Sequence, residues 1–259
     1  MAHVTFKGGV FPHKRKRFTR EKALEKFRPG RELVYPLRQH IGGTAVPVVA
    51  VGERVLEGQL LAEASGDISA RIHASVSGTV TAIEPRMTAS GREILSVVLE
   101  NDGLYEQMAV EQPVPWQTLE PGEVLRKIRE AGIVGMGGAG FPTHVKLGIR
   151  NAKRIRYVIV NGTECEPYMT SDYRRMLESP EELVEGLRIV LSLFERATGV
   201  FAIEDNKRDA ITAIQLASGS ESRMEVRVLE TKYPQGAERM LIYACTGAEI
   251  HSGQLPADA

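Results

Sequence analysis

The second half of the chain alternates short apolar runs with amphipathic stretches, and this alternation constrains the fold more than any other feature. The predicted strands are residues 156–160, 199–203 and 224–229, and the predicted helices are residues 179–196, 207–216 and 236–245. Ser179, Pro180 and Glu182 have the spacing of a capping box at a helix start. Strands separated by helices predict an α/β fold whose mainly parallel sheet is covered on both faces.

The first half predicts a different class of structure. Residues 42–99 contain short runs rich in Val, Ile and Ala that glycine interrupts, with little helical periodicity, which favours an all-β domain. Two similar pieces, residues 51–61 and 73–83, each place glycine where a hairpin turns tightly. Their GxxVxxGQ and SGTV segments resemble the biotinyl/lipoyl-type barrel-sandwich module. Residues 63–71 contain no lysine to which a swinging arm could be attached, so we interpret the module as structural.

These patterns divide the chain into four segments. They are a basic N-terminal arm at residues 1–40, a barrel-sandwich domain at residues 41–100, a linker at residues 101–120 and a Rossmann-like α/β domain at residues 121–259. The last segment opens with an amphipathic helix that begins at Pro121 and ends near Gly132, because its apolar residues share one face. The predicted fold class is therefore α/β, with an all-β barrel-sandwich hybrid domain in front.

Charge is balanced overall but concentrated at the N-terminus. The 33 Lys and Arg residues equal the 33 Asp and Glu residues in number, which disfavours nucleic acid as a partner. Residues 1–28 nevertheless hold nine Lys or Arg, including the run from Lys14 to Arg17. This arm is either a solvated, mobile segment or a docking element for anionic lipid or an acidic partner protein.

The chain has no apolar stretch near the roughly twenty residues of a membrane span and no apolar signal core at its start. Its two cysteines, Cys165 and Cys245, are about eighty residues apart, which predicts neither a disulfide framework nor a metal site. A reducing cytoplasm fits this cysteine usage best.

The segment from Gly135 to Gly140 formally matches the G-x-G-x-x-G pattern. Dense glycines let backbone N–H groups approach a phosphate. The pattern alone is weak, because a dinucleotide fingerprint follows a strand and opens a helix, whereas here a helix precedes it and Phe141 and Pro142 follow. An ordinary Rossmann interpretation fails on this context, but it stays partly open because Glu164 follows the predicted strand at residues 157–160, about where a ribose-binding acid would lie.

Two further segments lie where a parallel sheet binds ligands. Residues 161–168, NGTECEPY, follow a predicted strand, and ligands of open α/β sheets bind at the carboxyl ends of strands. A binding loop and a plain surface loop are both open there. Residues 233–238, YPQGAE, lead into a helix N-terminus with free N–H groups, and a simple helix start is the alternative.

Four motifs in order resemble the RnfC family of the Rnf electron-transport complex and, in layout, the flavoprotein of respiratory complex I. They are GMGGAGFPTHVKL, NGTECEPYMTSD, FAIEDNK and KYPQGAERMLIYACTG. The segments QHIGGTAVPVVAVGERVLEGQ and IHASVSGTVTAIEPR are similar to the barrel-sandwich domain of that family. The resemblance covers the chain from about Lys7 onward.

The resemblance implies a domain that binds FMN without a covalent bond, accepts a hydride from NADH and passes electrons on singly. It implies that the dinucleotide and flavin site is lined by Gly135, Gly137, Gly138 and Gly140. It further implies stacking of Phe141 on NADH and neutralisation of phosphate by Lys146. The residues implied on the flavin and nicotinamide side are Asn161, Glu164 and Glu166, and those implied to close the pocket are Tyr233, Gly236 and Glu238.

The resemblance also implies partners and a location. The partners are the other Rnf subunits, both membrane-bound and ferredoxin-like, with ferredoxin reached indirectly, and the location is the cytoplasmic face of the inner membrane. The family continues into a β-grasp domain and a CxxCxxCxxxCP domain, so iron–sulfur clusters are expected only in that region, which this sequence does not contain.

The sequence departs from the complex I pattern at two positions and leaves two alternatives open. Met136 stands where that pattern has arginine, and Thr163 stands where it has aspartate. One alternative is a cobalamin reductase of propanediol-utilising compartments, which has a similar two-domain start. The other is a non-catalytic scaffold that only docks other subunits.

Overall fold

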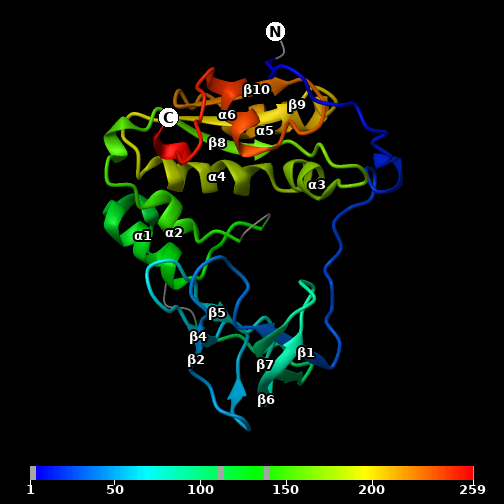
Figure 1. Cartoon of the computed structure of the whole chain (residues 1–259), viewed down its shortest axis with the longest axis vertical. Coiled ribbons are helices and arrows are strands. Elements are labelled where there is room, and N and C mark those ends of the chain that lie inside the picture. The colour runs from blue at the N-terminus through cyan, green and yellow to red at the C-terminus, as the bar shows by residue number, and fades with distance from the viewer. Residues whose placement is uncertain (1–3, 110–113, 137–139, 259) are drawn as a thin grey trace. The chain divides into compact units, whose positions relative to one another are not determined.

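The computed structural model describes residues 4–109, 114–136 and 140–258 (Figure 1). Contacts divide the chain into two compact units, of which one is Phe27–Ile149 and the other joins the residues up to Lys26 to Arg150–Ala259. The first is called the β unit below, and the second the α/β unit. The domain boundaries expected from the sequence at residues 40, 100 and 120 stay a prediction.

The β unit contains two antiparallel sheets. The larger has the order β1 (Glu32–Pro36), β7 (Glu93–Asn101), β6 (Gly78–Met87) and β3 (Arg54–Val55). The smaller has the order β2 (Val46–Pro47), β4 (Leu60–Glu63) and β5 (Ile72–His73). The all-β prediction for this half is confirmed, and the chain does contain the expected β-domain followed by an α/β architecture.

The inner faces of these sheets form one apolar core. Leu61, Val80 and Leu99 are fully buried in it, together with the other apolar side chains that alternate along the strands. Glycine acts in two ways around this core. Gly58 turns the chain with φ of 87°, as expected. Gly78 instead lies in a strand, where a Cβ would be 2.1 Å from the Glu100 carbonyl oxygen, so close backbone approach explains it.

The β unit also carries two helices, α1 (Pro121–Glu130) and the short α2 (Thr143–Leu147). Helix α1 begins and ends close to its predicted positions. After it, Gly132 has φ of 66°, and a Cβ there would lie 2.3 Å from the Arg71 carbonyl oxygen. Glycine is therefore required at this helix end both by conformation and by space.

The α/β unit is built on a parallel sheet with the order β10 (Met224–Leu229), β9 (Thr198–Glu204) and β8 (Tyr157–Gly162). The connections run through α3 (Ser171–Glu178) and α4 (Pro180–Leu191), and then through α5 (Arg208–Ser218). Parallel crossovers are almost always right-handed, and both of these step across the sheet in one direction, so their helices cover the same face. Helix α6 (Glu238–Thr246) covers the other face, as Figure 1 shows.

The helix predicted over residues 179–196 ends earlier, at Leu191. The reason is long-range: the Arg223 guanidinium, just before β10, donates to the carbonyl oxygens of Leu191 (3.2 Å) and Phe194 (2.5 Å). It thereby satisfies carbonyls at the helix end that would otherwise lack partners. The predicted capping box is also wrong in one respect, because the Ser179 side chain makes no cap hydrogen bond. Helix α3 was not predicted.

The N-terminal residues that the structure describes bond to the α/β unit at several points, which the sequence did not predict, while most of their side chains are exposed. The Val4 N–H donates to the Val228 carbonyl oxygen at 3.1 Å, and Val10 and Tyr233 exchange backbone hydrogen bonds of 2.8 Å. Further along, strand β1 lies within the predicted arm and pairs with β7. The start of the predicted arm therefore pairs with backbone of the α/β unit, and its end forms a strand of the β unit.

The β-unit core can be tested with Leu61→Ala. Leu61 is fully buried, and a Leu→Ala change in such a site lowers the free energy of unfolding by about 2–5 kcal/mol. We expect that loss in chemical denaturation. Leu104→Ala is the matched control because Leu104 is 63% exposed, and its loss should be within about 0.5 kcal/mol. Equal losses in the two variants would contradict the packing.

The α/β core can be tested through Cys245, which packs against Val200, Leu229 and Leu241. Burial raises the pKa of this thiol to about 11. We expect slow alkylation by iodoacetamide at pH 8 in the folded chain and fast alkylation in urea. Between pH 9 and 11 the thiol ionises only in the unfolded chain, so the free energy of unfolding should fall as pH rises. A Cys245→Ala variant should show a shallower slope, because only Cys165, the other thiol whose pKa is raised by burial, then contributes to it.

Candidate functional site

The carboxyl ends of β8 and β9 hold a buried carboxylate, Glu164, which is only 1% exposed. Helix α3 begins beside it, and the N–H groups of Asp172 (2.6 Å) and Tyr173 (3.2 Å) donate to Glu164 Oε1. A helix start presents free N–H groups and favours negative charge, which explains why this carboxylate can be buried. Burial and the nearby Glu164 raise the pKa of Asp172.

A second buried carboxylate, Glu204, ends strand β9 and pairs with the Lys207 ammonium. Both side chains are almost completely buried. Glu204 Oε2 also accepts the Glu164 N–H at 3.1 Å, so the two strand ends are joined through it. Buried charges persist when they are paired and hydrogen-bonded, and Glu204 Oε2 meets both conditions, whereas Oε1 is buried with no hydrogen-bond partner among the described residues.

Lys16 connects the N-terminal segment to the loop that follows β8. Its ammonium donates to the carbonyl oxygens of Glu166 (3.2 Å) and Met169 (2.5 Å), and it lies 3.7 Å from Glu164 Oε2. Burial lowers the pKa of Lys16, and the Glu164 carboxylate opposes that shift. One cation therefore fixes both ends of the 164–169 loop.

Two of the three predicted motifs come together in the α/β unit. The Asn161 Nδ2 donates to the Gly236 carbonyl oxygen at 3.0 Å, which joins the NGTECEPY and YPQGAE segments. Asn161 Oδ1 accepts from the N–H (3.2 Å) and hydroxyl (2.5 Å) of Thr163. A Cβ at Gly236 would lie 2.6 Å from Thr163 Oγ1, so only glycine permits this approach.

The remaining predicted residues of this unit take different positions. Glu166 is exposed in the loop after β8, and Tyr233 is 41% exposed with its backbone paired to Val10. Glu238 is the first residue of α6, as expected for a helix start. Glu164 differs from these because its carboxylate is already engaged by the protein's own groups.

The glycine-rich motif lies in the β unit. Gly137 and Gly138 are outside the described residues. On either side the chain forms a hairpin, in which the Gly135 N–H donates to the Phe141 carbonyl oxygen at 2.9 Å. Gly140 has φ of 60°, and a Cβ there would lie 2.8 Å from the Gln39 carbonyl oxygen. Phe141 is half-buried, whereas Lys146, which lies in α2, is exposed.

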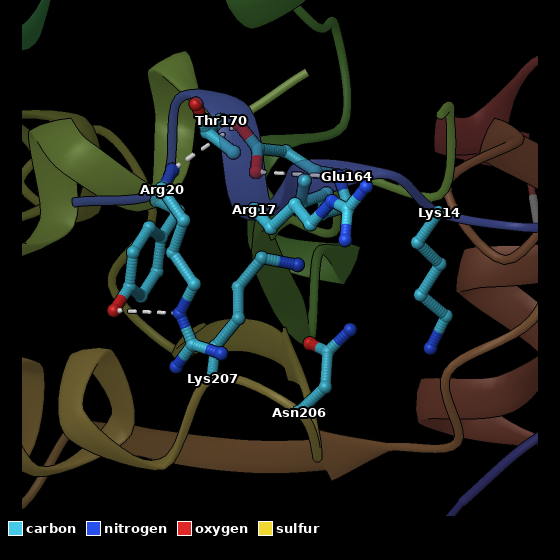
Figure 2. A pocket seen from close by; sticks show the side chains of 9 residues that line it. Lys14, Arg17, Arg20, Glu164, Thr170, Asn206 and Lys207 are labelled. Carbon is cyan, nitrogen blue, oxygen red and sulfur yellow. Dashed lines mark hydrogen bonds and ion pairs between the residues drawn. The ribbon is translucent and has the colours of Figure 1, made fainter. Parts of the chain in front are cut away.

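Sequence reasoning missed a pocket of about 270 Å³ in the α/β unit, which Figure 2 shows. Its walls come from the N-terminal segment, the loop after β8, α3 and the end of β9. The lining residues are Lys14, Lys16, Arg17, Arg20, Glu164, Thr170, Tyr173, Asn206 and Lys207. The charge run at residues 14–17 was the one sequence signal for it, but nothing local indicated what that run would face.

Two kinds of feature are absent from the described parts of the chain. Within residues 4–109, 114–136 and 140–258, no helix is both long enough and apolar enough to cross a bilayer. The same residues contain no group of three or more His, Cys, Asp and Glu side chains gathered as for a metal ion.

Comparison with known proteins assigns a family to each half. Residues 128–259 match the Nuo51 FMN-binding domain, and residues 4–104 match the RnfC barrel sandwich hybrid domain. One relative belongs to the Na(+)-translocating ferredoxin:NAD(+) oxidoreductase complex of Acetobacterium woodii and is 45% identical, over 99% of this chain and 58% of that protein. Its proton-translocating counterpart from Clostridium ljungdahlii is 43% identical, over 98% of this chain and 56% of that protein.

The chain thus spans a little over half the length of these two relatives. An NAD+-reducing NiFe hydrogenase in its H2-reduced state is 24% identical, with a TM-score of 0.41, over 50% of this chain and 25% of the other. That likeness is too weak to support any argument about function.

The contacts of Lys16 predict that Lys16→Met loosens the loop after β8. The change leaves two carbonyl oxygens and Glu164 without their cation, which costs about 1–3 kcal/mol. We expect faster amide hydrogen exchange at Tyr168, whose N–H donates to the Lys14 carbonyl oxygen at 2.8 Å. Lys22→Met, on an exposed lysine of the same segment, is the control and should leave that exchange rate unchanged.

Proposed function

The chain belongs to the RnfC family, and from that premise we propose that it is an FMN-binding, NADH-oxidising protein through which electrons enter a larger complex. The complex that it would serve is a membrane-bound, ion-translocating NADH:ferredoxin oxidoreductase. The observation that carries the proposal is the match of residues 128–259 to the Nuo51 FMN-binding domain, together with the joining of two predicted site segments by Asn161 and Gly236.

The residues at the carboxyl ends of the strands fit a flavin mononucleotide in their chemistry. The Nε2 of Gln235, next to Gly236, is buried and has no acceptor among the residues that the structure describes. A ring carbonyl or ribityl oxygen is an acceptor of the kind this donor lacks. The Asn161 amide adds a second polar group whose orientation is fixed by Thr163 and Gly236.

When bound, the flavin supplies the chemistry, by taking a hydride from NADH and releasing electrons one at a time. The chain's own residues bind the flavin, orient it and tune its reduction potential. Asn161 and Gly236 form a thin, rigid wall, because any larger residue than glycine at position 236 would meet Thr163. A thin wall suits two stacked flat rings, which must lie near van der Waals contact for hydride transfer.

The acids of the loop have different roles in this proposal. Glu166 is exposed, and its carboxylate would oppose the build-up of negative charge on the ring system beside it. Glu164 acts indirectly. Its buried carboxylate binds the N-terminus of helix α3 and Lys16, and these contacts hold the loop that carries Glu166 in place. The glycines of residues 135–140, with Phe141 and Lys146, would supply the dinucleotide side.

Partners and location are part of the same proposal. The two relatives are named as subunits of ferredoxin:NAD(+) oxidoreductase complexes, so we propose that the chain docks on other Rnf subunits at the cytoplasmic face of the inner membrane. Ferredoxin would be reached through those subunits. One relative is named for sodium and the other for protons, so the coupling ion is left out of the proposal.

The test is flavin binding followed by reduction. Adding FMN to the purified chain should quench flavin fluorescence, and NADH added without oxygen should then bleach the bound flavin. We expect Glu166→Ala and Gly138→Val to slow the bleaching or weaken FMN binding by about tenfold, the effect of losing about 1.4 kcal/mol. Circular dichroism would establish that both variants are folded.

Glu181→Ala is the matched control, because Glu181 is an exposed glutamate in the first turn of α4. It should bind FMN and bleach like the parent chain. If Glu166→Ala and Gly138→Val also behave like the parent, the assigned site is wrong. If the parent itself binds no FMN, a docking scaffold becomes the better explanation.

A further inference from the structure

The pocket of the α/β unit is lined by five cationic side chains and one carboxylate. Four of the cations, Lys14, Lys16, Arg17 and Arg20, come from the N-terminal segment, about 190 residues away in sequence from the fifth, Lys207. Figure 2 shows Lys14, Arg17, Arg20 and Lys207 around the pocket. Like charges repel, so bringing them to one cavity costs free energy unless anions are present. The carboxylates that the structure describes form ion pairs with only some of these cations.

The pairing of each cation shows where charge is left over. Lys207 is paired with Glu204, Lys16 lies near Glu164, and Arg20 is 3.9 Å from Asp209. Among the described residues, no carboxylate pairs with the Lys14 ammonium or with the Arg17 guanidinium, which lies over the Phe18 ring at 5.0 Å. Lys14 and Arg17 therefore give the cavity two unpaired positive charges.

The backbone that carries these cations is bonded to the loop after β8 before any ligand arrives. The Tyr168 N–H donates to the Lys14 carbonyl oxygen at 2.8 Å, and the Thr19 hydroxyl donates to the Tyr168 carbonyl oxygen at 3.1 Å. Tyr168 itself has φ of 68°, a conformation that few non-glycine residues adopt and that these bonds support. A preformed site loses less entropy on binding than a flexible arm of lysines does.

One more group in the cavity has unused hydrogen-bonding capacity. The Asn206 Oδ1 is buried and has no hydrogen-bond partner among the described residues. Figure 2 shows its amide turned toward the same space as Lys207 and Arg17. An amide oxygen only accepts hydrogen bonds, so Asn206 Oδ1 would bind the hydroxyl of a singly protonated phosphate group or a water molecule that accompanies it.

The volume decides what kind of anion fits. About 270 Å³ is several times the roughly 30 Å³ share of one water molecule, but below the roughly 300–1,000 Å³ of pockets for drug-sized ligands. From size and charge together, we propose that this pocket binds one phosphate group of a phosphorylated ligand. Planar guanidinium and compact ammonium groups are the usual partners of phosphate oxygens.

Glu164 does not prevent this. Its Oε1 accepts two N–H groups from α3, and its Oε2, which has no hydrogen-bond partner among the described residues, lies 3.7 Å from the Lys16 ammonium, so the negative charge is offset by the protein's own groups. The carboxylates of Glu166 and Asp172 also lie near Lys16, and their residues are exposed to solvent, which screens their charge from the cavity. Lys14 and Arg17 act on the ligand from the side of the cavity formed by the N-terminal segment.

The test uses inorganic phosphate and the whole chain, at ionic strength held constant with chloride. Binding is followed by phosphorus NMR, with Lys14→Gln as the variant and Lys22→Gln as its control. Both remove one lysine charge from the same segment, but only Lys14 lines the pocket. We expect about tenfold weaker phosphate binding in Lys14→Gln and no change in Lys22→Gln. No phosphate binding, or equal weakening in both variants, overturns the proposal.

Two further binding measurements, with FMN against riboflavin and with NADH, identify the source of the phosphate. The choice of these ligands rests on the proposed function. If FMN supplies it, FMN binds at least tenfold more tightly than riboflavin, and Lys14→Gln removes that difference. If the dinucleotide supplies it, the difference survives in Lys14→Gln, whereas NADH binding weakens by about tenfold. Phosphate binding without any flavin binding would support the pocket and reject the proposed function, so the two failures are distinguishable.

Discussion

The structure of the α/β unit depends on how two carboxylates are buried at the ends of neighbouring strands. Glu164 and Glu204 are almost completely buried, and each would be costly there without a partner. Helix α3 supplies two N–H groups to Glu164, Lys207 pairs with Glu204, and the Glu164 N–H joins the strand ends. Lys16 completes the set from the N-terminus. The packed N-terminal segment, the start of α3 and the shape of the loop after β8 are therefore consequences of one electrostatic requirement.

Regular elements were predictable because their causes are local. The strands β9 and β10 and the helices α1, α5 and α6 fall close to their predicted bounds, since each has its own apolar periodicity. The exceptions have distant causes. Helix α4 ends where Arg223 takes its carbonyl groups, and β1 exists because β7 pairs with it some sixty residues later in the chain. No window of sequence contains both members of such a pair.

The candidate site was predictable in composition but not in geometry. The motifs pointed to Asn161 and Gly236, and the structure joins these two residues. They could not distinguish Glu164, which the fold itself engages, from Glu166, which is exposed, because the two carboxylates stand two positions apart in one loop. A glycine in a predicted site can also have a purely structural cause. Gly140 has a left-handed backbone conformation and lies close to the Gln39 carbonyl oxygen, so the fold requires glycine there independently of any ligand.

The basic run at residues 14–17 shows how a charge pattern becomes specific. In sequence these four residues are equivalent cations. In the structure Lys16 bonds to backbone carbonyl oxygens and Lys14 lines the pocket, whereas Arg15 is exposed with φ of 49°. The left-handed turn at Arg15 lets its two neighbours face the loop after β8 while its own charge stays in solvent. A run of cations attracts any anion through its electrostatic field, but the hydrogen bonds of Tyr168 and Thr19 hold the backbone of this run against the loop after β8, where Lys14, Lys16 and Arg17 line one cavity.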